Sequence, residues 1–151
     1  MGVVGRVLPV AEAFVLATLV AALAFTAWWM SPRVFLTALV IASLHTVFLG
    51  VPLYILLRWK RRLTAFTAIF GCFLIGAVPM AMWSWPLANP ELKRSVVDSR
   101  WGQTMVDGVP TTAGWLLYGS DVLLFGAAGL LAGVVFWFYL RIRAEPDQEV
   151  R

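Results

Sequence analysis

The sequence predicts an all-α fold: a polytopic membrane protein with four transmembrane helices in an antiparallel bundle and a short amphipathic helix in its outer loop. Of the 151 residues, 61% are hydrophobic and only 13% are charged, whereas a soluble domain carries about 25% charged residues. The lysines and arginines lie at the ends of long apolar runs, as is typical of membrane proteins. Nucleic-acid binding would need them clustered on one soluble face, so we expect no nucleic-acid partner.

Four apolar runs are long enough to cross a hydrocarbon core of about 30 Å. Every backbone N–H and C=O group inside that core must be paired within the chain, so each run is expected to be a helix. We expect one membrane domain over residues 1–151, with spans at about 10–30, 34–57, 63–85 and 115–140, an outer loop at 86–113 and a cytoplasmic tail at 141–151. The first run is longer than a signal-peptide core of about 7–15 residues, so we expect it to remain as a span.

The positive charges on the two sides of these spans orient the chain. One side holds eight, namely Arg6, Arg58, Lys60, Arg61, Arg62, Arg141, Arg143 and Arg151, and the other holds four, namely Arg33, Lys93, Arg94 and Arg100. Because positively charged loops stay in the cytoplasm, both termini and the hairpin Arg58–Arg62 are expected inside. The four cations of this hairpin are expected to contact anionic head groups. Specific binding of a lipid or a partner there is the alternative.

The outer loop carries a helix-like pattern. Asn89-Pro90-Glu91 resembles an N-cap, a first-turn proline and an acid at the positive end of a helix. Apolar residues recur near helical spacing at Leu92, Val96, Val97, Trp101 and Met105, and Gly108 supplies a stop. We therefore predict a short amphipathic helix from Asn89 to Gly108. It would serve as an interfacial anchor or, alternatively, as a lid or docking surface for a partner.

Small residues at four-residue spacing mark the expected packing face of each span. The third span has Cys72 and Gly76, and the fourth has Gly129 and Gly133 as a GxxxG motif. Small residues let membrane helices approach closely. The pattern fits packing within the chain, a homodimer or another membrane-protein partner equally well. Cys72 is the single cysteine, which excludes an intrachain disulfide.

The best candidate for chemistry is His45, near the middle of the second span, with Thr46 beside it. An ionisable group at that depth is costly and usually faces the protein interior or water. The first interpretation is a neutral imidazole bonded to Thr18, Thr67 or a carbonyl freed by Pro52. The alternatives are a proton relay, a metal ligand or a substrate contact. One histidine without a nearby Cys, His or acid makes no metal site, so we expect no metal and no cofactor.

Two acids near the spans have local explanations. Asp121 is interpreted first as the N-cap of the fourth helix. If that helix instead begins near Trp115, Asp121 lies about 9 Å below its start and could pair with His45. Glu12 follows Pro9 in what is expected to be the first helical turn, where the helix dipole favours an acid.

Pro52 and Pro79 interrupt neighbouring spans, each shortly after a glycine. Broken helices in corresponding places can mark the binding sites of transporters. Kinks that serve packing are the more common use of proline in membrane helices. We therefore treat both prolines as candidate hinges.

The stretch Leu44-His45-Thr46-Val47-Phe48-Leu49-Gly50-Val51-Pro52-Leu53-Tyr54, the basic hairpin after it and Phe73-Leu74-Ile75-Gly76-Ala77-Val78-Pro79 resemble small four-span inner-membrane proteins of Gram-negative bacteria. Residues 126–137 are similar to the last helix of those proteins. The resemblance covers about half of the chain. It implies the fold and an inner-membrane location, and it carries no established activity.

Two functions remain open. The first is a non-catalytic membrane protein that binds a partner, such as an assembly or regulatory factor, through its outer loop. The alternative is a small transporter or channel subunit that uses His45. An enzyme is not expected, because one histidine and acids at the helix ends do not supply a nucleophile, a base and an orienting group together.

Overall fold

The structure is a computed structural model, and it describes residues 3–29, 32–89, 95–98 and 100–144. The helices are α1 (Val3–Trp29), α2 (Pro32–His45), the π-helical segment η1 (Thr46–Gly50), α3 (Val51–Trp59), α4 (Ala65–Trp83) and α5 (Thr112–Ala144). The strands are β1 (Val96–Asp98), β2 (Gly102–Val106) and β3 (Val109–Pro110). Within the described residues, four stretches are long and apolar enough to cross a membrane, as predicted: Leu8–Ala27, Arg33–Trp59, Ala65–Trp83 and Thr112–Arg143.

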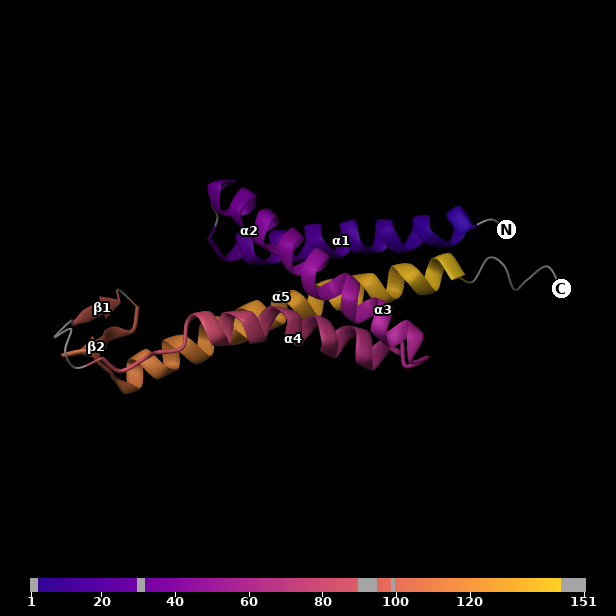
Figure 1. The fold of residues 1–151 in the computed structure, drawn as a ribbon. Coiled ribbons are helices and arrows are strands. Elements are labelled where there is room, and N and C mark those ends of the chain that lie inside the picture. The colour runs from indigo at the N-terminus through magenta and orange to yellow at the C-terminus, as the bar shows by residue number, and fades with distance from the viewer. Residues whose placement is uncertain (1–2, 30–31, 90–94, 99, 145–151) are drawn as a thin grey trace.

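The helix α5 is central to the arrangement. It packs along both α1 and α4, whereas α2 packs mainly on α1, and α3 makes little contact with α4. Figure 1 shows the continuous stretch α2–η1–α3 crossing the other helices at an angle. The strands lie at one end of the molecule, called the sheet end below (Figure 1). The turn from α3 to α4 lies at the opposite end, called the hairpin end, where α1 begins and α5 ends (Figure 1).

The described core is built almost entirely from alanine. Its buried apolar residues are Ala13, Ala17, Ala22, Ala38, Ala68, Ala77, Ala132 and Phe136. Small side chains let helix backbones approach closely, and this contact is the main source of helix association in lipid. Larger apolar side chains such as Phe48, which is 70% exposed, point away from the protein, as expected for residues that face hydrocarbon.

A widened turn at η1 joins α2 to α3. The N–H of Val51 bonds to the carbonyl of Thr46, five residues back. Pro52 lacks an N–H, and its ring would clash with a carbonyl four residues back, which explains why the regular ladder is interrupted just before it. Pro79, in contrast, lies inside α4, which continues unbroken to Trp83.

Both sides of the basic hairpin are capped. Arg61 has a positive φ of 53°, and the N–H groups of Arg61 and Arg62 bond to the carbonyls of Arg58 and Leu57. This is a Schellman motif, in which the left-handed position is usually occupied by glycine. Thr64 then begins α4 through a reciprocal capping box with Thr67.

The prediction of an amphipathic helix from Asn89 to Gly108 is wrong for the residues that the structure describes. They form a three-stranded antiparallel sheet in the order β1-β2-β3, while residues 90–94 and 99 lie outside the described residues. Asp107 and Gly108 have φ values of 47° and 76°, as a tight I′ turn between two strands requires. Gly108 is therefore part of a hairpin turn and does not end a helix.

The interpretation of Asp121 as a helix cap is also wrong. The helix α5 begins at Thr112, and the hydroxyl of Thr111 caps it by accepting from the N–H of Gly114 at 3.2 Å. Similarly, Pro9 lies inside α1 and not at its start. The 33 residues of α5 extend about 50 Å, well beyond a core of about 30 Å.

Candidate functional site

A half-open groove of about 600 Å³ lies between the membrane-length helices. Side chains from α1, from α2–η1–α3, from α4 and from α5 all line it, and nearly all of its surface is apolar. It runs from Arg33 near the start of α2 to Leu57 near the end of α3. The groove exists because α2 packs on α1 while small residues of α4 and α5, such as Ala128, leave the opposite side unfilled.

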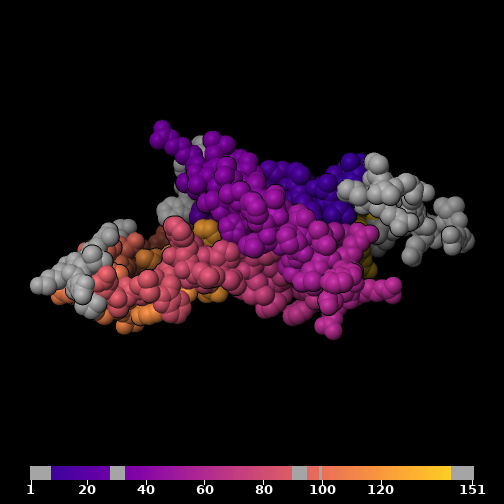
Figure 2. Space-filling view, in the orientation of Figure 1, coloured from indigo at the N-terminus to yellow at the C-terminus, as the bar shows by residue number. Residues whose placement is uncertain are grey.

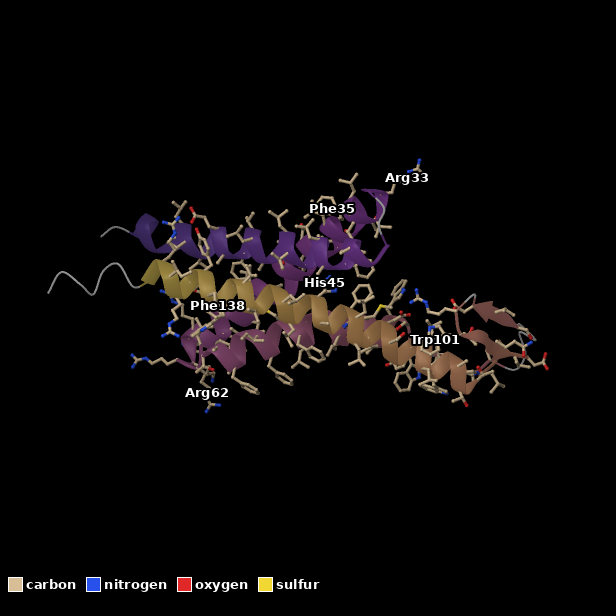
Figure 3. The ribbon with its side chains drawn as sticks, turned by 180° about the vertical axis from the view of Figure 1, so that it is seen from behind. Arg33, Phe35, His45, Arg62, Trp101 and Phe138 are labelled. Carbon is tan, nitrogen blue, oxygen red and sulfur yellow. The ribbon has the colours of Figure 1, made fainter. Side chains whose placement is uncertain are left out.

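His45 lines this groove and is half-buried. Its Nδ1 lies 2.8 Å from the carbonyl oxygen of Ile41 in the same helix. A carbonyl only accepts, so Nδ1 carries the hydrogen in this contact. Among the described residues, neither Thr67 nor Thr18 bonds to His45. Figure 3 shows His45 near the middle of the molecule's long axis.

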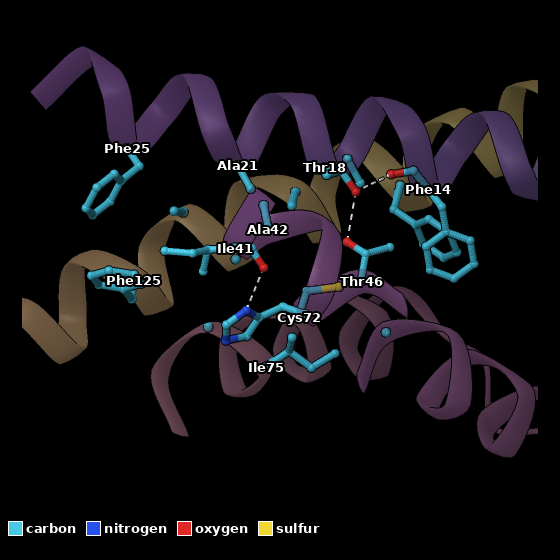
Figure 4. Close-up of a pocket in the computed structure, with 18 of the residues that line it drawn as sticks. Phe14, Thr18, Ala21, Phe25, Ile41, Ala42, Thr46, Cys72, Ile75 and Phe125 are labelled. Carbon is cyan, nitrogen blue, oxygen red and sulfur yellow. Dashed lines mark hydrogen bonds between the residues drawn. The ribbon is translucent and has the colours of Figure 1, made fainter. Parts of the chain in front are cut away.

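Thr46 connects the second span to the first. Its hydroxyl lies 2.8 Å from the hydroxyl of Thr18, and Thr18 donates to the carbonyl of Phe14 at 2.8 Å. Since each hydroxyl has one hydrogen, Thr46 donates to Thr18. Figure 4 shows these bonds beside the groove. The hydrogens of both hydroxyls are used within the protein, that of Thr46 on Thr18 and that of Thr18 on the Phe14 carbonyl. The two threonines therefore contribute little polar character to the groove.

The structure does not bring Asp121 to His45. Phe25 of α1 packs on Phe125 of α5, with ring centroids 4.8 Å apart, which fixes the relative height of the two helices. Thr18, near the level of His45, is seven residues from Phe25 toward the hairpin end. Asp121 is four residues beyond Phe125 toward the sheet end. The two levels therefore differ by roughly 15 Å along the helix axes.

The four residues predicted for helix packing meet where α4 contacts α5. A Cβ added to Gly129 would overlap the carbonyl oxygen of Cys72, and one on Gly76 would overlap the carbonyl of Phe125. A Cβ on Gly133 would come within 2.9 Å of the Cβ of Cys72. Each glycine is therefore required by a close backbone approach. Cys72 is half-buried in this contact.

At the hairpin end, one of the predicted head-group residues is fixed at the mouth of the groove. Arg58 donates from its guanidinium to the hydroxyl of Tyr54 at 2.7 Å, and Tyr54 lines the groove. Lys60 lies over the ring of Trp59, at 5.1 Å from its centroid. Arg61 occupies the strained left-handed position of the turn. Arg62 extends away from the helices at this end (Figure 3).

A polar cluster that the sequence did not predict joins α1 and α5 at the hairpin end. Tyr139 donates a hydrogen bond to the carboxylate of Glu12. The guanidinium of Arg143 lies 3.6 Å from the same carboxylate and donates to the hydroxyl of Tyr139 at 3.3 Å. Tyr139 and Arg143 are one helical turn apart, which is a local signal. Glu12, which both of them contact, is 127 residues from Tyr139, and no local pattern indicates it.

The sheet is fixed to the start of α5. Thr104 of β2 is 7% exposed, and its carbonyl accepts from the N–H of Thr111 at 3.1 Å. A Cβ on Gly114 would overlap that same carbonyl oxygen. The hydroxyl of Thr111 also donates to the carbonyl of Gln103 at 2.6 Å. Glycine at position 114 therefore allows β2 to lie directly on the helix backbone.

An aromatic cluster marks the level at which α5 leaves the other helices. The ring of Trp85 packs edge-on against Trp115 and against Tyr118, both at 5.6 Å between centroids. Aromatic rings of this kind gather at membrane–water interfaces. Figure 2 shows the sheet end projecting beyond α1 and α2. Trp101 lies beside the sheet end of α5 (Figure 3).

The described residues contain no group of three or more His, Cys, Asp or Glu side chains placed to hold a metal ion. Comparisons of the chain with protein-family models, curated proteins and solved structures found no match. The resemblance to small four-span inner-membrane proteins therefore stays a prediction. Function has to be argued from the sheet, the groove and the basic hairpin.

Proposed function

We propose that this chain is a non-catalytic integral membrane protein that binds a protein partner through the sheet β1-β2-β3 and acts as an assembly or regulatory factor. The observation that carries this proposal is the docking of β2 on Gly114 of α5. A segment that only linked two helices would not need a fixed sheet on the backbone of a helix. A fixed sheet offers a partner a preorganised surface, which lowers the entropic cost of binding.

In the membrane, the four spans are proposed to form an antiparallel bundle in the bacterial inner membrane. The unequal count of positive charges supports a cytoplasmic hairpin end and an outer sheet end. The basic hairpin then lies among anionic head groups of the cytoplasmic leaflet. The aromatic cluster of Trp85, Trp115 and Tyr118 is placed in this arrangement at a membrane–water interface, where such rings are common.

The exposed side chains of the sheet support partner binding. Val97 is 68% exposed and Val109 is 47% exposed. Lipid covers the exposed apolar side chains of the spans. These two valines lie instead on the sheet, which projects beyond α1 and α2 (Figure 2). Apolar side chains exposed on a water-facing surface are a feature of interaction sites.

A photo-crosslinking amino acid at Val97 tests the proposal in cells. We expect a protein adduct of discrete mass at Val97, and we expect Gly114→Ala to reduce it because the sheet is no longer held in place. The same probe at Val15, which is 59% exposed on a membrane-length helix, is the control. If Val97 gives no protein adduct, or if Gly114→Ala leaves the adduct unchanged, the proposal is wrong.

The groove that reaches His45 favours a second candidate, a small transporter or channel subunit with Pro52 and Pro79 as hinges. This candidate predicts that His45→Ala abolishes activity, while a flexible linker in place of residues 95–108 is tolerated. Partner binding through the sheet predicts the reverse pattern. The two variants, compared in one complementation assay, therefore separate the candidates.

A further inference from the structure

The groove between α2–η1–α3 and α4 is long, apolar and open along one side. Its lining follows α2–η1–α3 from Arg33 to Leu57, which are 24 residues or about 36 Å apart along the helices. Its volume of about 600 Å³ lies within the range of small-molecule sites, about 300–1,000 Å³. A long apolar groove of this size suits an extended hydrocarbon chain.

The lining of the groove suits a chain of this kind. Its walls are formed largely by alanine, glycine and aliphatic or aromatic side chains, including Ala42, Ile75 and Phe125. Figure 4 shows Ile41 and Ile75 on different helices that line the groove, with Phe25 and Phe125 toward one end and Phe14 toward the other. The Thr18 and Thr46 hydroxyls on this surface bond to each other. His45 also lines the groove, so its imidazole is a polar group on an otherwise largely apolar wall.

Cations lie at both ends of the groove: Arg33 lines the sheet end, and the hairpin with four cations adjoins the other end. Leu57 and Leu63 line the groove at the hairpin end. Leu57 directly precedes Arg58, and Leu63 directly follows Arg62. Among the described residues, Arg58 uses one guanidinium nitrogen on Tyr54 and keeps further N–H donors for a ligand. A guanidinium with parallel donors matches the oxygen atoms of a phosphate.

A backbone feature supports a role for the hairpin cations beyond orienting the chain. Arg61 adopts a positive φ that costs a non-glycine residue free energy, in a motif where glycine is the usual occupant. Strained positions of this kind persist where function requires the side chain. The charge is therefore kept at a position where glycine would fit the backbone better.

We propose that the chain binds an anionic glycerophospholipid of the cytoplasmic leaflet, with its phosphate on the Arg58–Arg62 hairpin and one acyl chain in the groove. The phosphate accepts hydrogen bonds from Arg58, and the acyl chain enters between Tyr54 and Leu63 and extends toward Ile75. The inference rests on the proposed placement of the hairpin among head groups. It is independent of the sheet, so its failure would leave the crosslinking result at Val97 unaffected.

Native mass spectrometry of the full chain tests this inference, with dioleoyl phosphatidylglycerol and dioleoyl phosphatidylcholine as the two probes. The two lipids carry the same acyl chains, so a difference in how much of each stays bound to the protein measures the contribution of the head group. We expect tighter binding of the anionic lipid, and a loss of about tenfold in its affinity for Arg58→Gln. Equal binding of both lipids would overturn the proposal.

Groove-filling variants test the acyl chain. Ile75→Trp should lower the affinity for phosphatidylglycerol about tenfold or more, while its neighbour Leu74→Trp, outside the groove and 41% exposed, should not. Ile41→Trp on the opposite wall, with Val40→Trp as its control, repeats the test in case one variant fails to fold. Unchanged affinity in the folded groove variants would overturn the proposal. So would equal binding of glycerol 3-phosphate, which has no chains.

Discussion

Gly114 lies where the sheet meets α5, and a single methyl group there should detach one from the other. In Gly114→Ala, the new Cβ would overlap the carbonyl oxygen of Thr104. Ordinary contact needs about 3.5 Å between atoms, so β2 would have to move away by about 1 Å. That movement breaks the bonds from Thr111 to the carbonyls of Thr104 and Gln103, at 3.1 and 2.6 Å. Each is worth about 1 kcal/mol, so the sheet should lose about 2 kcal/mol of docking free energy.

Amide hydrogen exchange in detergent or nanodiscs measures this loss. A loss of 2 kcal/mol corresponds to roughly 30-fold faster opening of the docked amides, chiefly those of Thr111 and of β2. The matched control is Gly119→Ala, because a Cβ at position 119 of the same helix meets nothing within 4 Å. Alanine there should be neutral or stabilise the helix by up to about 1 kcal/mol. If exchange in Gly114→Ala equals that of wild type, the close approach does not hold the sheet.

Three further substitutions test other contacts. Tyr139→Phe removes the bond to Glu12 and should lower the free energy of unfolding by about 1.5–3 kcal/mol, seen as a lower thermal midpoint in detergent. Arg61→Gly should raise stability by about 1 kcal/mol, because glycine tolerates the positive φ, and should be detected in the same assay. Thr46→Val removes the hydroxyl that donates to Thr18 and should cost about 1 kcal/mol.

Each of these has its own control. Phe138 lies next to Tyr139 and is 57% exposed, so Phe138→Leu should leave the thermal midpoint nearly unchanged. If Phe138→Leu lowers the thermal midpoint as much as Tyr139→Phe does, the bond to Glu12 does not stabilise the fold. Arg62→Gly removes the same charge without relieving a positive φ, so equal stabilisation would show that charge was the cause. Thr26→Val affects a hydroxyl that, among the described residues, donates to the carbonyl of Ala22 in its own helix. An equal loss there would exclude a contribution from the interhelical bond.

The spans were predictable because length and apolar composition decide them locally. The faces that carry Cys72 and Gly129 were predictable for the same reason, since spacing alone marks a face of small residues, but the sequence did not indicate that these two faces meet each other. The segment from Val96 to Met105 misled the prediction, because its apolar spacing fits a helix. The stronger signal was Asp107-Gly108 between two valines, a sequence typical of a tight hairpin.

Features that depend on how the helices meet were not predictable. The bond between Glu12 and Tyr139 joins the two ends of the chain, and nothing near either residue indicates the other. The groove arises because α2 packs on α1 and leaves α4 uncovered, which depends on the angle of the second span. The start of α5 depends on the Thr111 cap and on the sheet beside it. Hydropathy alone therefore predicted a start near residue 115, whereas the helix begins at Thr112.

The central place of α5 has a consequence for biogenesis. The helix that both α1 and α4 pack against follows them in the chain, so the first three spans are synthesised before their main partner. Until then, α1 and α2 have each other, while the glycine face of α4 is open to lipid. A chain stopped before Thr112 would therefore be expected to lack the contacts that hold α1 and α4 together through α5.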